Sequence, residues 1–299
     1  MKKIALATTL LAMTAGSALA ADLPSTKAPL LPPPPPPPMW TGFYVGLNAG
    51  GTWANNNQIW TSGFPLGDPA GPAADESLGI AASVPLLGGG GSGGFIGGGQ
   101  IGYNYQFYNS FLIGLEADIQ GLTSNGAAST SMGVAPVFNN DTGLSFVSRS
   151  RGVDYIGTVR GRLGWLFTPT LLLYGTGGFA YGGVTLNSGV VSSELNGFFG
   201  PINSTGIAAS AFADTRTGWT AGGGVEWMFM PNWSAKVEYL YYDLGTVSIN
   251  TTMTGFDTGT ANPDWFAGVN TRTRFDGHIV RAGLNYHFNW GAAPVVAKY

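Results

Sequence analysis

The sequence predicts an all-β protein, an eight-stranded antiparallel up-and-down transmembrane β-barrel with long extracellular loops and short periplasmic turns. Apolar and polar residues alternate with period two along much of the chain. Tiny turns alternate with long connections, as in barrels that cross an outer membrane. Only 10% of the residues are charged, against about 25% in soluble domains, so an open sandwich would lack the charges to solvate its outer faces.

The first twenty residues are typical of a secretory signal peptide. Lys2 and Lys3 precede an apolar stretch, and small residues end it at Ala20. The stretch is shorter than the roughly 20 apolar residues that a membrane-spanning helix needs. We therefore expect a signal peptide over 1–20, cleaved between Ala20 and Ala21, and export from the cytoplasm.

A proline-rich segment follows the expected cleavage site. Residues 21–39 end in seven consecutive prolines, Pro32 to Pro38, which favour an extended polyproline II conformation. We expect a stiff periplasmic spacer here, a barrel over 40–290 and a C-terminal tail over 291–299.

Eight segments show the alternation of half-buried strands, and they are connected unequally. Three connections are short turns near 109, 169 and 231, whereas segments near 54–94, 123–150, 186–213 and 248–272 are long and rich in Gly, Ser, Thr and Asn. Short turns on one side and long loops on the other are typical of outer-membrane barrels. The expected strands are 43–49, 95–107, 111–121, 155–167, 171–184, 216–229, 233–242 and 280–288.

Aromatic residues gather beside the short turns and at the two ends of the strand series. Aromatic rings are enriched where a barrel crosses the membrane interface. We expect a periplasmic aromatic girdle formed by Trp40, Tyr108, Phe111, Trp165, Phe167, Trp227, Phe229, Trp233 and Trp290.

The polar faces of the strands carry four acids and four bases. An eight-stranded barrel has a lumen just wide enough to be filled by side chains, and charges buried in so narrow a space must pair. The sequence therefore predicts an ion-pair network that plugs the barrel, formed by Glu116, Asp118, Arg160, Arg162, Glu226, Lys236, Glu238 and Arg281.

Composition removes most catalytic chemistry. The chain has no cysteine and only two histidines, and it carries no GxSxG or HExxH motif. A net charge of -3 leaves no basic footprint for nucleic acid. We expect no enzyme activity, no cofactor, no metal and no nucleic acid; the expected partners are outer-membrane lipid and lipopolysaccharide, the barrel assembly machinery and an unidentified ligand of the loops.

The strand sequences resemble the small outer-membrane immunogenic proteins of alphaproteobacteria, the Brucella and rhizobial group of surface antigens. The resemblance implies an eight-stranded barrel that supports outer-membrane integrity and presents surface antigen, and some relatives are described as porin-like or haem-binding. The stretches that carry it are WTGFYVGLNAG from Trp40, GLEADIQG from Gly114, GTVRGRLGW from Gly157, YGTGGFAYG from Tyr174, GWTAGGGVEW from Gly218, NWSAKVEYLYYDLG from Asn232 and IVRAGLNYHF from Ile279.

Two features depart from the family pattern. The first loop, 54–94, is long enough to add strands or a cap. The aromatic end of the barrel at Phe288 is followed by a tail that ends in Tyr299, so either aromatic residue could serve as the signal for barrel assembly.

Together these observations predict a structural β-barrel in the outer membrane of a Gram-negative bacterium, with a plugged interior and a surface-exposed antigenic face. A small diffusion porin is one alternative. A receptor that binds haem or a host ligand through its extracellular loops is the other.

Overall fold

The computed structural model describes residues 40–55, 58–67, 74–89, 93–108, 110–123, 128–137, 140–198, 200–259 and 262–288. The expected signal peptide, the spacer over 21–39, Trp290 and the tail over 291–299 lie outside the described residues. No helix in these ranges has the length and hydropathy that a membrane-spanning helix requires.

The described residues form one antiparallel sheet of eleven strands with a single helix beside it. Eight strands close a ring in the order β1, β4, β5, β7, β8, β9, β10, β11, because β11 also pairs with β1. The elements are β1 (Gly42–Ala54), β2 (Ile59–Gly67), α2 (Ala74–Ser83), β3 (Leu87–Gly88), β4 (Gly94–Phe107), β5 (Phe111–Leu122), β6 (Ala128–Pro136), β7 (Thr142–Thr168), β8 (Leu171–Leu195), β9 (Ile202–Met230), β10 (Trp233–Asp257) and β11 (Pro263–Phe288).

The ring confirms the predicted up-and-down barrel, but the expected long loops are wrong in three places. The segment 186–213 is almost entirely strand, divided between β8 and β9, and 248–272 is divided in the same way between β10 and β11. The segment 123–150 contains β6 and the first part of β7. The first loop, 54–94, adds β2, α2 and β3, as its length suggested.

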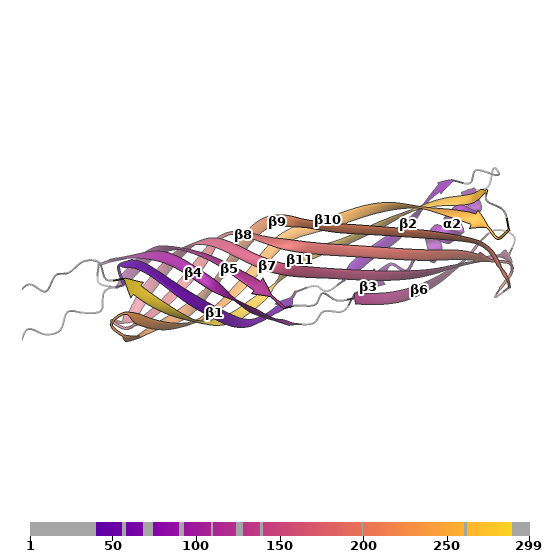
Figure 1. Cartoon of the computed structure of the whole chain (residues 1–299). Coiled ribbons are helices and arrows are strands. Elements are labelled where there is room, and N and C mark those ends of the chain that lie inside the picture. The colour runs from indigo at the N-terminus through magenta and orange to yellow at the C-terminus, as the bar shows by residue number, and fades with distance from the viewer. Residues whose placement is uncertain are drawn as a thin grey trace, which may run out of the picture. The chain divides into compact units, whose positions relative to one another are not determined.

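The sheet therefore has two sections. Figure 1 shows β1, β4 and β5 at one end and β2, β3 and β6 at the other, while β7 to β11 run through both. We call the first section the barrel and the second the extension. In the extension, β6 pairs with the first half of β7, and β2 pairs with the first half of β11.

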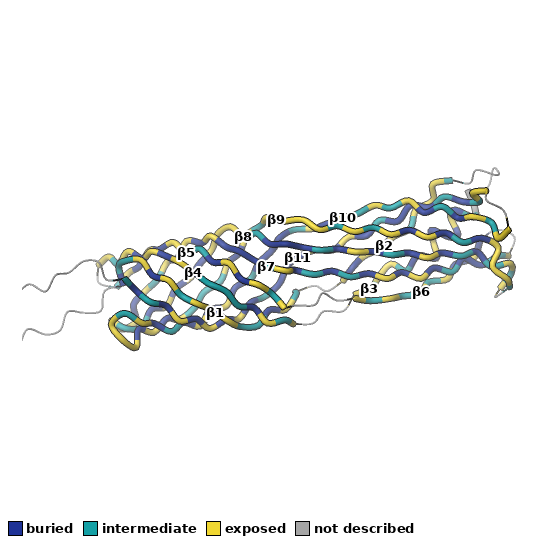
Figure 2. Tube along the Cα trace, in the orientation of Figure 1, coloured by how far each residue is buried: buried dark blue, intermediate teal, exposed yellow. Residues whose placement is uncertain are grey.

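Burial alternates along the strands in both sections (Figure 2). On the barrel, large apolar side chains such as Leu115, Leu163 and Val237 point outward and are exposed. On the extension, apolar side chains such as Leu186 and Val190 instead point inward and are buried. The barrel is thus built to face an apolar surrounding and the extension to face water.

Two rings of aromatic side chains bound the exposed apolar belt of the barrel. The turn-side ring lies beside the short turns, and the far ring lies where the barrel meets the extension. Trp233 and Tyr241 mark the two rings on β10 and stand eight residues apart, or about 20 Å along the axis at a strand tilt of about 40°. Members of the far ring are Trp53, Tyr155, Phe179, Tyr181, Trp219, Tyr239, Tyr241 and His278.

Candidate functional site

Strand register brings the predicted interior charges together. Glu116 on β5 is the direct partner of Arg160 on β7. Glu226 on β9 is the partner of Lys236 on β10, and Glu238 on β10 is the partner of Arg281 on β11. Opposite charges that face each other across neighbouring strands stabilise that pairing.

The same side chains also reach across the lumen and join into one network. Arg160 donates to Glu116, Asp118 and Glu238 at 2.5, 2.8 and 3.0 Å. Arg281 binds Asp118 at 2.9 Å and Glu238 at 2.5 Å.

Arg162 and Lys236 complete this network at its turn-side end. Arg162 contacts Glu226 at 2.6 Å, and the Lys236 ammonium lies 2.9 Å from Glu116. All eight predicted residues therefore take part, and each of their side chains has 0% of its surface exposed.

Neutral side chains add further hydrogen bonds to the network, although Arg162 Nε and Arg281 Nη1 have no acceptor among the described residues. The Tyr44 hydroxyl donates to Glu116 at 2.6 Å, and the Tyr174 hydroxyl donates to Glu238 at 3.1 Å. Asn285 donates to Glu226 at 2.7 Å, and the His287 imidazole lies 3.5 Å from the same carboxylate. Hydrogen bonds of this kind are what allow buried charges to persist.

Apolar layers close the lumen on both sides of the network. On the turn side, Trp40, Leu112, Leu166, Leu172, Tyr174 and Met228 pack together. On the other side lies a larger cluster made of Ile59, Ile96, Val153, Ile156, Ala180, Val184, Leu186, Leu240, Tyr242, Leu244, Val247, Phe275 and Ile279. The interior is therefore packed from the turns into the extension.

The predicted place of Trp40 in the aromatic girdle is wrong. Trp40 has 0% of its surface exposed, its indole NH donates to the Pro169 carbonyl at 3.0 Å, and its ring packs edge-on against His287. A tryptophan with a partner for its NH is stable inside. Seven predicted girdle residues are exposed on the outer surface beside the turns, namely Tyr108, Phe111, Trp165, Phe167, Trp227, Phe229 and Trp233.

The extension has its own interior, arranged around α2. Ile80 and Val84 at the end of this helix are buried against Val147, Trp265 and Val269. Glycines let the backbones approach closely: a Cβ on Gly63 of β2 or Gly133 of β6 would collide with the carbonyl of Ala81 or Ser83.

A buried arginine joins the added elements to the long strands. Arg149 on β7 donates to Thr61 on β2, to Ser131 on β6 and to the carbonyl of Pro85, just after α2. Burial lowers the pKa of the Arg149 guanidinium. Arg149 lies inside the expected loop 123–150, where no alternation marks it as an interior residue.

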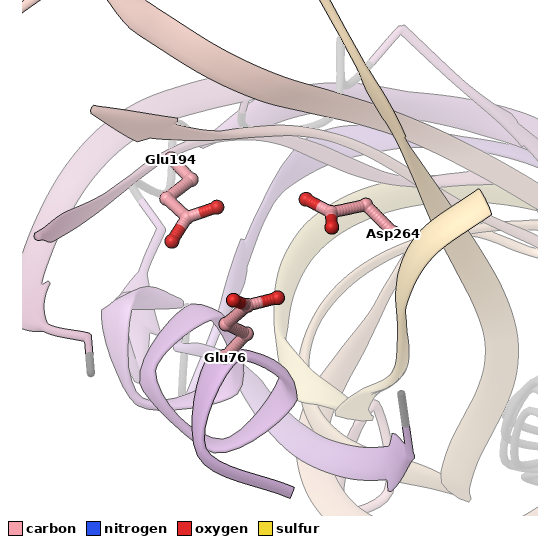
Figure 3. A group of neighbouring side chains, drawn as sticks. All are labelled: Glu76, Glu194 and Asp264. Carbon is pink, nitrogen blue, oxygen red and sulfur yellow. The ribbon is translucent and has the colours of Figure 1, made fainter. Parts of the chain in front are cut away.

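Three carboxylates meet near the outer end of the extension (Figure 3). Glu76 comes from α2, Glu194 from β8 and Asp264 from β11, and an oxygen of each lies within 4.8 Å of the others. Ser204 donates to Glu194 at 3.3 Å. Burial and the charges of Asp264 and Asp141 raise the pKa of Glu194 above its ordinary value of 4.5.

Comparison with known proteins agrees with this architecture. A family model described as "Outer membrane protein beta-barrel domain" matches residues 8–288. The 31 kDa outer-membrane immunogenic protein of Brucella melitensis is 34% identical over 295 residues, which cover 96% of this chain and 100% of that protein. The 25 kDa outer-membrane immunogenic protein of Brucella abortus is 27% identical over 50% of this chain and 55% of its own length.

Solved structures of outer-membrane proteins were matched as well. OprG from Pseudomonas aeruginosa has a TM-score of 0.34 and 9% identity, and the match covers 83% of this chain and 97% of that one. Ail from Yersinia pestis has a TM-score of 0.26 and 12% identity, with 82% and 99% covered.

Proposed function

This chain belongs to the outer membrane protein β-barrel family, and from that premise we propose that it is a non-enzymatic structural barrel with a closed lumen and a surface-exposed extension that presents antigen. The proposal rests above all on one observation: the eight charged side chains inside the barrel pair with one another and have no exposed surface. The short turns then face the periplasm, and the extension projects from the cell.

The balance of charge in the lumen supports a structural role over conduction. Four acids meet four bases there, whereas a selective pore usually carries rings of one sign along its wall. Buried ion pairs need good geometry and further hydrogen bonds to offset their desolvation. The network has both, so its residues are suited to holding the barrel together.

The outer face of the extension supports a role in surface interactions. A row of large apolar side chains crosses four neighbouring strands, because Met132 pairs with Phe146, Phe146 with Val191 and Val191 with Ile207. All four are exposed. Contiguous apolar side chains on an exposed surface are typical of interaction sites.

Single-channel conductance in a planar bilayer tests the closed lumen. Protein purified from outer membranes is expected to give no stepwise current. Heat-modifiable mobility on denaturing gels, compared between unheated and boiled samples, is the check that the protein is folded. The Arg160→Ala and Glu116→Ala variants are to be measured in the same way, with Leu163→Val on the outer face as the matched control.

Reproducible current steps in the wild type that change in the Arg160 or Glu116 variant but not in the control would contradict the proposal. They would show that these residues line a pathway, and the protein would then be a small diffusion porin. Cleavage of peptide or phospholipid substrates by folded protein would contradict the non-enzymatic part.

A further inference from the structure

The lysines and arginines of the described residues are divided between the interior and one small region of the outer surface. Six of these nine side chains are buried inside the barrel or the extension. The other three are Arg216, Arg272 and Arg274, which lie on β9 and β11 just beyond the far aromatic ring. Arg272 and Arg274 are exposed and Arg216 is half-buried, so the exposed arginines of the described residues lie at one height of the outer surface.

The height of Arg272 and Arg274 corresponds to the headgroup layer of the surrounding leaflet. His278 belongs to the far ring, and Arg274 precedes it by four residues on the same outward face of β11, toward the extension. Four residues of strand span about 13 Å, or about 10 Å along the axis at a tilt of about 40°. Cationic side chains just outside the apolar core of a membrane attract anionic headgroups.

Arg272 contacts an aromatic ring and has free hydrogen-bond donors among the described residues. It is exposed, and its guanidinium lies 5.9 Å from the ring centre of Trp60, its direct partner on β2. None of the described residues accepts a hydrogen bond from it. A guanidinium over an aromatic ring gains a modest cation–π attraction at an exposed site, and its planar donors match two oxygens of a phosphate.

Arg274 adds a second guanidinium beside the first. It is two residues away on the same face, about 7 Å along the strand, and it pairs with Asp243. The Arg274 side chain is 56% exposed and that of Asp243 only 6%. The buried Asp243 carboxylate therefore orients the Arg274 guanidinium, and more than half of the arginine side chain stays accessible to a ligand.

The surface chemistry changes in a definite order along β10 and β11. Nearest the membrane core are the rings of Tyr239 and His278. The two arginines come next, and beyond them Asn270 donates to Ser248 and Asn250 on an exposed, uncharged surface. Acyl chains, a phosphorylated sugar and uncharged sugars follow one another in the same order in a phosphorylated glycolipid.

We propose that Arg272 and Arg274 form a binding site for the phosphorylated sugar headgroup of a glycolipid in the outer leaflet. The site is continuous with the lipid-facing belt, so its occupant is a lipid rather than phosphate from solution. It rests on the membership of the outer-membrane family and is independent of whether the lumen is closed.

Retention of lipid A by purified protein tests this site. Wild type, Arg272→Ala/Arg274→Ala and the control Arg216→Ala are to be placed in phosphatidylcholine nanodiscs with increasing amounts of diphosphorylated or dephosphorylated lipid A. Arg216 is a suitable control because its guanidinium donates to the Thr246 carbonyl at 3.3 Å. Heat-modifiable mobility on denaturing gels checks that each variant is folded, and native mass spectrometry counts the bound lipid.

We expect the double variant to lower the affinity for diphosphorylated lipid A at least about tenfold, with less than a twofold change for Arg216→Ala. Dephosphorylated lipid A should be retained equally by all three proteins, and millimolar inorganic phosphate should not displace the bound lipid. Equal retention by wild type and double variant would overturn the site. An equal loss in Arg216→Ala would show a general charge effect instead, and displacement by inorganic phosphate would show a site for free phosphate.

Discussion

The guanidinium of Arg160 on β7 reaches across the lumen to the carboxylate of Glu238 on β10, with Nη1 3.0 Å from Oε1. Two strands, β8 and β9, separate β7 from β10 along the wall, so this ion pair joins opposite sides of the ring. Register alone places charges next to each other on adjacent strands. Contacts across the lumen also link strands that are not neighbours in the sheet.

Removal of Arg160 is expected to destabilise the whole barrel. Arg160→Ala removes three of the buried ion pairs, those with Glu116, Asp118 and Glu238, and breaking a buried pair in this way costs about 3–5 kcal/mol. The free energy of unfolding is to be measured by urea titration in lipid vesicles. The outward neighbour Val159, changed to Leu, is the control and should change it by less than about 1 kcal/mol; an unchanged midpoint for Arg160→Ala would mean that the network is not structural.

Trp40 is expected to behave as a core residue. Trp40→Ala removes a fully buried ring and its hydrogen bond to Pro169, for which about 3–5 kcal/mol is usual. Trp233→Leu on the outer surface exchanges one apolar group for another in contact with lipid and should cost much less. The same urea titration compares them, and equal losses would place Trp40 at the interface after all.

Arg149 is expected to hold the extension together without affecting the barrel. Its loss removes the hydrogen bonds to Thr61, Ser131 and Pro85, at about 1–3 kcal/mol for each buried acceptor that is left unsatisfied. Limited proteolysis should cut Arg149→Ala in the segment around α2 several times faster than wild type. The heat-modifiable gel mobility, which reports on the folded barrel, should stay the same. Ser148→Ala, next to it on the outer face, is the control, and equal cutting rates in both variants would contradict this role.

The outer end of the extension is expected to be more stable in mild acid than at neutral pH. The pKa of Glu194 is raised in the folded protein, so folding favours its protonated form. That stability is complete below the ordinary pKa of 4.5 and is lost as the pH rises through the raised value. Glu194→Gln should remove most of this dependence.

Hydrogen exchange measures the effect locally. The exchange rate of amides near Glu194 in wild type, divided by that in Glu194→Gln at the same pH, cancels the intrinsic pH dependence of exchange. This ratio should rise between about pH 4.5 and 7. A ratio that does not change with pH would show that ionisation of Glu194 does not destabilise the folded extension.

Strand parity explains why the barrel could be predicted from the sequence. Polar residues of one parity, such as Glu116 and Arg160, point inward, and apolar residues of the other parity, such as Leu115 and Leu163, point outward. Closure of the ring then leaves the eight charges no other place. Trp40 stands at the start of the series with no preceding strand residues to fix its parity, and its direction could not be predicted.

The extension could not be predicted because apolar residues point outward in one part of a strand and inward in another part of the same strand. On β8, Phe179 and Tyr181 face outward as apolar residues, but Leu186 and Val190 have the other parity and face inward. The outside is lipid at one level and water at the next, so an apolar residue changes sides. Many intervening residues are Ser, Thr, Gly and Asn, which are also typical of loops.

The uninterrupted course of β7 to β11 limits how such a protein can change length during evolution. One residue inserted near the middle of β8 would turn every later side chain of that strand to the opposite face, exposing Leu186 and burying polar groups unless a bulge absorbed it. Deletions have the same effect. Tolerated insertions and deletions should therefore concentrate in the connections near 196–201 and 258–262, where loop length costs little, and the surface that we propose to present antigen should vary mainly there.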